Sequence, residues 1–90
     1  MSKGVRMSAR HNLLHAPQGV ALRIVDIAGG EGMRRRLFSL GFHVGDTIEL
    51  GAQAILRGPV LIRNVGTEVT VAIGRGIAQK IMVEAVDERK

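Results

Sequence analysis

Histidine side chains are the residues of this chain best suited to bind a metal. His11 and His15 are four residues apart, which would place both imidazoles on one side of a helix, as in helices that bind zinc. No cysteine or carboxylate lies near them in sequence, and Pro17 leaves little helix to fix their geometry. We therefore expect solvated histidines. No metal site and no cofactor are expected, since the sequence offers ferrous iron or zinc no ligand cluster.

A run of arginines and a third histidine are the candidates for contacts with a partner. Arg34 and Arg35 lie on the polar side of an expected helix, where they could meet an acidic patch or a phosphate. Phe42 and His43 follow that helix, and His43 is expected in an exposed turn. These four residues are the predicted partner-binding set. The simpler alternative is that the charged run faces solvent and binds nothing.

The sequence gives no catalytic site. Its serines are Ser2, Ser8 and Ser39, two of its three histidines lie near the N-terminus, and the six carboxylates of residues 13–86 are spread singly. A nucleophile, a base and an orienting group are nowhere grouped, although nucleophilic catalysis needs them together. We therefore expect a protein that is not an enzyme.

The element with the clearest signals is a helix from Gly30 to Leu40. Met33, Leu37 and Leu40 recur at i, i+4 and i+7, so at about 100° per residue they share one side of a helix. Gly41 follows directly, and glycine favours the left-handed conformation that ends a helix. The residues expected to have structural roles are Gly30, Leu37, Leu40, Gly41 and Gly45.

Five stretches rich in aliphatic and β-branched residues predict strands. They cover residues 20–27, 47–56, 60–65, 68–73 and 81–86. A bend is expected at Gly51, and residues 77–80 fit one helical turn. Short strands joined by glycine turns favour a small, strongly bent antiparallel barrel. The predicted fold is mainly β, with five antiparallel strands and one short α-helix after the first strand.

Length and charge indicate one small domain. The 90 residues include no cysteine, which suits a reducing cytoplasm, and no apolar run is long enough for export or direct membrane insertion. Residues 1–12 are expected to form a disordered basic tail, 13–86 the folded domain, and 87–90 a polar end. The formal charge is +5, but residues 13–86 carry eight basic and six acidic groups. The tail is therefore interpreted as a solvated leader rather than a nucleic-acid-binding arm.

The segment Arg36-Leu37-x-x-Leu40-Gly41-Phe42-x-x-Gly45 resembles the core motif of the ferrous iron transport protein A (FeoA) family. The similarity extends over about residues 13–86 through glycine, proline and aliphatic positions in the family's order. These are Pro17, Gly19, Ile27, Gly29, Gly30, Gly58, Pro59, Ala78, Ile81 and Val83. Family members often carry an acidic residue before the hairpin proline, where this chain has Arg57-Gly58, so no role of that carboxylate transfers.

This resemblance implies an SH3-like barrel and a cytosolic accessory or regulatory protein of bacterial ferrous iron uptake. It implies binding to the cytosolic GTP-binding region of the ferrous iron transporter, a membrane protein. Two alternatives stay open: a metal-responsive module that oligomerises, and a small barrel that binds nucleic acid. Nucleic acid is not an expected partner, because Phe38 and Phe42 are both explained by helix packing. Pairing of barrel edges allows a homodimer.

Overall fold

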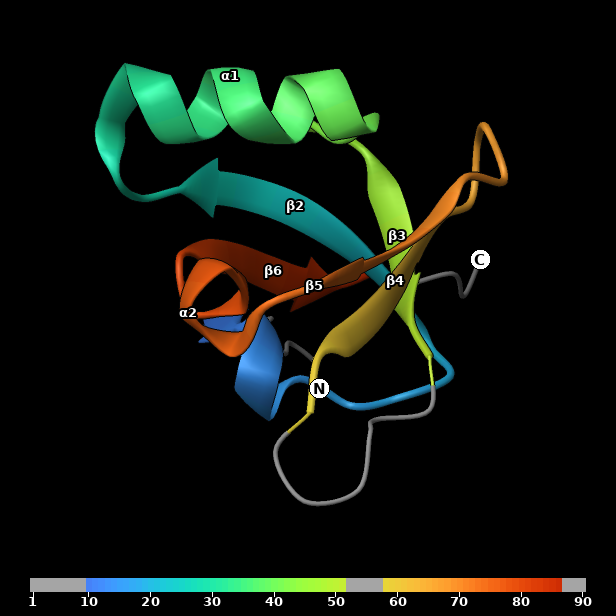
Figure 1. Ribbon diagram of the computed structural model, residues 1–90. Helices are drawn as coiled ribbons and strands as arrows, with labels where there is room; N and C mark the ends of the chain where they lie inside the picture. The colour runs from blue at the N-terminus through green and yellow to red at the C-terminus, as the bar shows by residue number, and fades with distance from the viewer. Residues whose placement is uncertain (1–9, 52–57, 87–90) are drawn as a thin grey trace, which may run out of the picture.

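The computed structural model describes residues 10–51 and 58–86, which form a curved antiparallel sheet with one helix across its open end (Figure 1). The strands are β1 (Arg10–Asn12), β2 (Ala21–Ile27), β3 (Thr47–Leu50), β4 (Val60–Asn64), β5 (Thr70–Ile73) and β6 (Ile81–Ala85). The helices are α1 (Gly30–Leu40), the short α2 (Arg75–Ala78) and a 3₁₀ turn, η1 (Leu13–His15). The strand order is β1-β6-β2-β3-β4-β5, and every neighbouring pair is antiparallel.

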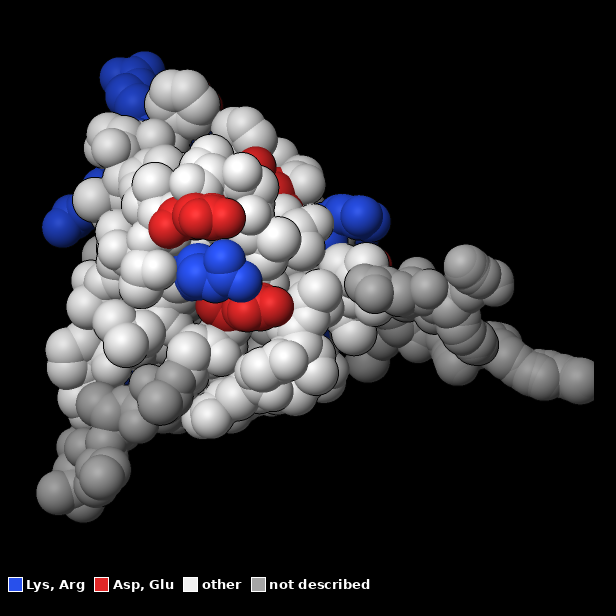
Figure 2. Space-filling view, turned by 90° about the vertical axis from the view of Figure 1, so that its right-hand side faces the viewer, with Lys and Arg blue, Asp and Glu red and all other residues white. Residues whose placement is uncertain are grey.

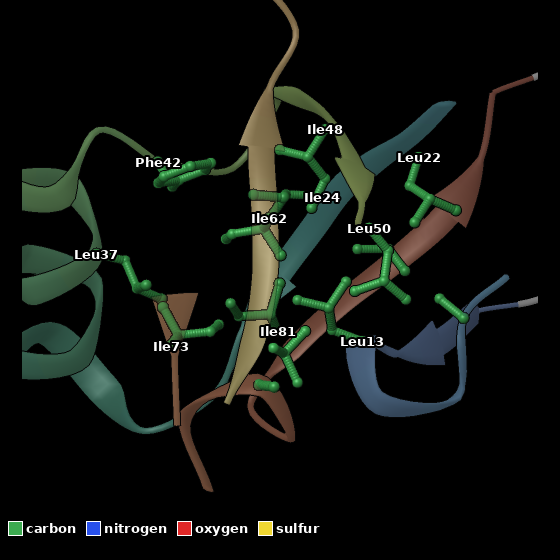
Figure 3. Packing of buried hydrophobic residues seen from close by; sticks show 14 of the residues in the cluster. Leu13, Leu22, Ile24, Leu37, Phe42, Ile48, Leu50, Ile62, Ile73 and Ile81 are labelled. Atoms are coloured by element: carbon green, nitrogen blue, oxygen red, sulfur yellow. The ribbon is translucent and has the colours of Figure 1, made fainter. Parts of the chain in front are cut away.

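The buried aliphatic side chains form one core inside this curved sheet. Figure 3 shows Leu37 of α1 beside Ile73 of β5, with Phe42 above them. η1 contributes Leu13 from the opposite side of the core, and all four side chains are almost fully buried. Burying a side chain of this size contributes roughly 1.5–3 kcal/mol. The fold is therefore held by packing, as expected of a chain without cysteine.

Helix α1 has the bounds that the sequence predicted, because glycines determine both of its ends. Gly29 precedes the helix with φ 103°, and Gly30 has φ 80°, so the chain turns sharply out of β2. At the other end Gly41 has φ 103°, and the Phe42 N–H donates to the Leu37 carbonyl at 2.9 Å. A left-handed residue directly after the last helical residue, with this hydrogen bond, is a common way for an α-helix to end.

The prediction that Leu40 packs in the core with Met33 and Leu37 is wrong. Leu37 is fully buried and Met33 is half-buried, whereas Leu40 is 38% exposed. The helix contacts the core along a line centred on Leu37, and Leu40 lies to one side of that line. Phe42, which is fully buried and follows the end of the helix, fills the core there instead.

The structure has six strands and not the five predicted, and α1 follows the second strand rather than the first. The additional strand is β1, which pairs with β6 in the register Arg10↔Glu84. An ion pair joins Arg10 Nε to Glu84 Oε2 at 3.2 Å. The prediction of a disordered tail is therefore wrong for residues 10–12. The strand was missed because three residues are too few to show an alternating pattern. The predicted extension of β3 to residue 56 lies outside the described residues.

A register shift in β2 explains its burial pattern. The pairing of β2 with β6 shifts between Ile24 and Asp26, so one strand has an extra residue at Val25. Ile24 and Ile27 are both buried although they are three residues apart. The shift moves the second half of β2 by one position, and this aims Asp26 at the surface just before the turn into α1.

Candidate functional site

A groove lies between α1, the end of β2 and the turn that follows the helix. It has a volume of about 430 Å³, and its lining residues are Val25, Asp26, Ile27, Arg34, His43 and Val44. Two of the predicted partner contacts, Arg34 and His43, therefore lie together in the fold. They approach each other because the chain reverses at Gly41 and returns alongside the helix (Figure 1).

An exposed aromatic pair stands beside this groove. The rings of Phe38 and His43 are stacked, with centroids 5.9 Å apart and an angle of 16° between their planes. Phe38 is 64% exposed, the highest value among the large exposed hydrophobic residues, and neighbouring Val44 is 46% exposed. An apolar ring held flat against a second ring offers a partner a rigid contact surface.

Asp46 fixes the position of His43. The backbone N–H of His43 donates to Asp46 Oδ2 at 2.8 Å, and His43 Nδ1 lies 3.1 Å from Asp46 Oδ1. Gly45, for which a structural role was predicted, has φ 100° and provides the left-handed residue that this tight turn needs. The turn is thus closed on itself before β3 begins at Thr47.

Asn64 connects this turn to the rest of the molecule. It is the buried polar residue of the described chain, only 3% exposed. Its Nδ2 donates to the Gly41 carbonyl at 2.9 Å and to Asp46 Oδ2 at 3.0 Å, while its Oδ1 accepts from Gly66 N at 3.0 Å and Thr67 N at 3.4 Å. Sequence reasoning missed this residue, because an asparagine near a glycine signals only a turn.

The arginines of α1 lie at the surface, as predicted. Arg34 Nη2 is 3.7 Å from Asp26 Oδ1, and both side chains are about half exposed, so this ion pair contributes little to stability. Arg35 and Arg36 are exposed, and within the described ranges neither makes an ion pair. We call the exposed set Arg34, Arg35, Phe38, His43 and Val44 the helix–turn surface.

The prediction that Phe42 contacts a partner is wrong, since its side chain is fully buried. Phe42, predicted as a partner contact, is buried, and Phe38, expected to pack with the helix, is exposed. Phe42 packs in the core (Figure 3), whereas Phe38 follows Leu37 about 100° around the helix and is 64% exposed. Exposure of Phe38 also removes one of the arguments against nucleic acid.

The histidines near the N-terminus do not share a helix. His11 belongs to β1 and His15 to η1, and the part of the chain that the structure describes holds no group of three or more His, Asp or Glu side chains placed for a metal ion. Over the same residues, no helix has the length and apolar character needed to cross a membrane.

A second groove, of about 550 Å³, lies over β3 and β4 and contains none of the predicted site residues. Glu49 and Arg63, which are cross-strand neighbours, line it and form an ion pair with 3.1 Å between Oε1 and Nη2. Figure 2 shows one face of the molecule, turned by 90° from the view of Figure 1, where a basic side chain lies between two acidic ones and most of the described surface is uncharged. Among the described residues on this face, charges of both signs are therefore interspersed and form no continuous basic patch.

Comparison with known proteins places this fold in a family. The family model described as "FeoA domain" matches residues 11–85. A protein of Methanocaldococcus jannaschii named "Putative Fe(2+) transport protein A" is 38% identical over 72 residues, which cover 80% of this chain and 83% of that protein.

Solved structures agree with this assignment. A crystal structure of an iron uptake regulatory protein (FeoA) superposes with a TM-score of 0.74 and 32% identity, covering 87% of this chain and 99% of the other. The fold alone is shared with a FeoA-like protein from Clostridium acetobutylicum (TM-score 0.75, 19% identity, 93% and 95% covered) and with a manganese-dependent transcriptional repressor (0.76, 20%, 91% and 45%). The chain thus belongs to the FeoA family, whose small antiparallel, SH3-like fold and association with ferrous iron transport were expected from its sequence motif.

Proposed function

We propose that this protein is a cytoplasmic accessory and regulatory component of ferrous iron uptake, and that its helix–turn surface binds the cytosolic GTP-binding region of the ferrous iron transporter. Family membership supports the connection to iron transport. The observation that supports the surface is the exposed ring of Phe38, stacked on His43 beside a groove that Arg34 lines.

The composition of this surface suits protein recognition. Aromatic and arginine side chains carry a large share of the binding energy at protein interfaces, particularly when they surround a pocket. Phe38 and Val44 supply apolar area, and Arg34 and Arg35 supply positive charge at its edge. The matching partner surface would carry an apolar side chain to enter the groove and carboxylates to meet the arginines.

The surface is also held in place before any partner arrives. Asp46 holds His43, Asn64 holds both Asp46 and the end of α1, and Leu37 anchors the helix in the core. A surface that is already ordered loses less conformational entropy on binding, so more of its contact energy appears as affinity.

Regulation requires a difference in affinity between two states of the partner. An accessory protein that binds both nucleotide states of a GTP-binding domain equally shifts neither of them. We therefore expect the affinity for the transporter domain to differ between its GTP-bound and GDP-bound forms.

The test is a titration of the ¹⁵N-labelled full chain with the purified cytosolic domain of the transporter, with GDP and with a non-hydrolysable GTP analogue. We expect amide shifts centred on residues 34–44, and Phe38→Ala should weaken binding by roughly tenfold or more. The matched control is Leu61→Ala, since Leu61 is 41% exposed on β4, and it should change the affinity less than about twofold. Equal losses in both variants, or shifts confined to β4, would refute this binding surface.

Nucleic acid is the second candidate, because Phe38 is exposed beside two arginines. A single-stranded oligonucleotide would then bind with an affinity that falls steeply as salt is raised. The ion pair between Arg34 and Asp26 weighs against this candidate. The metal-responsive alternative stays a prediction for which the described residues supply no ligand cluster.

A further inference from the structure

Within residues 10–51 and 58–86, strand β5 forms one edge of the sheet, and no described strand pairs with its outer side. β5 ends the strand order, with β4 as its neighbour in the sheet. The Asn64 N–H donates to the Val69 carbonyl at 2.8 Å, so Val69 points its backbone groups toward β4. Because these groups alternate in direction along an antiparallel strand, Val71 and Ile73 also face β4. Thr70 and Ala72 therefore direct their N–H and C=O groups outward, and both residues are exposed.

This edge lacks the features by which proteins prevent edge pairing. Thr70, Val71, Ala72 and Ile73 include no charge and no proline, and the β4–β5 register runs without a bulge. The opposite edge, β1, contains Arg10 and His11 within three residues. Of the two edges, β5 is thus the one whose sequence permits another strand to add to it.

We propose that two copies of the chain pair antiparallel along β5, about a two-fold axis that passes Val71. In this register Thr70 of one copy pairs with Ala72 of the other and Ala72 with Thr70, so all the outward groups of both residues are satisfied. A register with Thr70 opposite itself would leave the groups of Ala72 facing Glu68, whose N–H already donates to the Asn64 carbonyl.

Side chains on both sides of this register are compatible with a second copy. Val69, which is 40% exposed, would lie opposite Ile73 of the other copy and lose water-accessible apolar surface. Glu68 precedes β5 and Arg75 follows it, so in the reversed pairing the acidic end of one copy's strand lies beside the basic end of the other's. An uncharged strand bounded by Glu68 and Arg75 is thus complementary to itself when reversed.

Cross-linking tests the axis directly, because the chain has no cysteine of its own. Two residues that face each other without mutual hydrogen bonds in an antiparallel pair have Cα atoms about 4.5 Å apart, within the range that a disulfide spans. Val71→Cys should therefore give a covalent dimer on mild oxidation. Leu61→Cys, at an exposed position of β4 one strand away, is the control and should remain monomeric on a non-reducing gel. Equal cross-linking at both positions, or none at Val71, overturns the proposal.

Sedimentation equilibrium provides the second readout. Ala72→Pro removes an outward N–H without affecting the β4 ladder, so the dimer dissociation constant should rise by roughly tenfold or more. Ala72→Val keeps the N–H and should change the constant less than about twofold. A wild-type chain that stays monomeric at millimolar concentration overturns pairing between copies. If Ala72→Pro then weakened binding to the transporter domain, the edge would pair with a partner strand instead.

Discussion

Replacing Asn64 with alanine tests whether this residue organises the helix–turn surface. The variant loses two donated hydrogen bonds, to the Gly41 carbonyl and to the Asp46 carboxylate, and the bonds that Gly66 and Thr67 donate to Asn64 Oδ1. Neutral hydrogen bonds contribute about 0.5–1.5 kcal/mol each and those to a charged group about 1.5–3 kcal/mol. Some of the freed groups will reach water, so we expect a loss of roughly 2–4 kcal/mol in the free energy of unfolding.

That loss is a large fraction of the stability of a domain of this size, which is of order 5–13 kcal/mol. Urea unfolding followed by circular dichroism measures it, and Asn12→Ala is the matched control. Asn12 accepts one hydrogen bond, from Leu14 N at 3.0 Å, so its loss should cost only about 1 kcal/mol. In Asn64→Ala, amide shifts should extend to His43 and Gly66, on both sides of the deleted side chain. A loss below that of Asn12→Ala, or shifts on one side alone, would show that Asn64 does not connect these turns.

Two further predictions concern the helix and a strained turn. Leu37→Ala should lower the free energy of unfolding by roughly 2–5 kcal/mol, because it opens a cavity in the core. Leu40→Ala should lower it by less than about 1 kcal/mol, because Leu40 is partly exposed. Similar losses for the two variants in urea unfolding would contradict this difference in burial. Glu68 has φ 68° without being glycine, so Glu68→Gly should raise the melting temperature through a gain of about 1 kcal/mol, and a lower melting temperature would argue against strain at this turn.

The sequence predicted the bounds of α1 because the signals that determine them are local. The glycines at both ends and the spacing of Met33 and Leu37 act within the helix itself, and they do not depend on what packs against it. By contrast, β1 has three residues, and its existence depends on pairing with β6, more than 60 residues away. Pairing over such a separation leaves no periodic signal in so short a segment.

The candidate site was predicted only in part, because its assembly also depends on contacts between residues far apart in the sequence. Arg34 and His43 were chosen for their residue types, and the fold brings them to one groove. Phe38 and Phe42 have the same side chain, so which of them faces solvent depends on how the turn at Gly41 docks on the sheet. Asn64 was missed because its partners, Gly41 and Asp46, are 23 and 18 residues away and belong to other elements.

Asn64 also lies between the two surfaces proposed for binding. Its side chain holds Asp46 and the end of α1, and its backbone carbonyl accepts from Glu68 N at the approach to β5. The variants nevertheless separate the two proposals. Phe38 belongs to α1 and Ala72 to the outer edge of β5, so Phe38→Ala should leave the dimer dissociation constant unchanged, and Ala72→Pro should leave the affinity for the transporter domain unchanged. A change in both constants from either variant would mean that dimerisation and transporter binding are energetically coupled. By linkage, each binding event would then change the affinity of the other by the same factor.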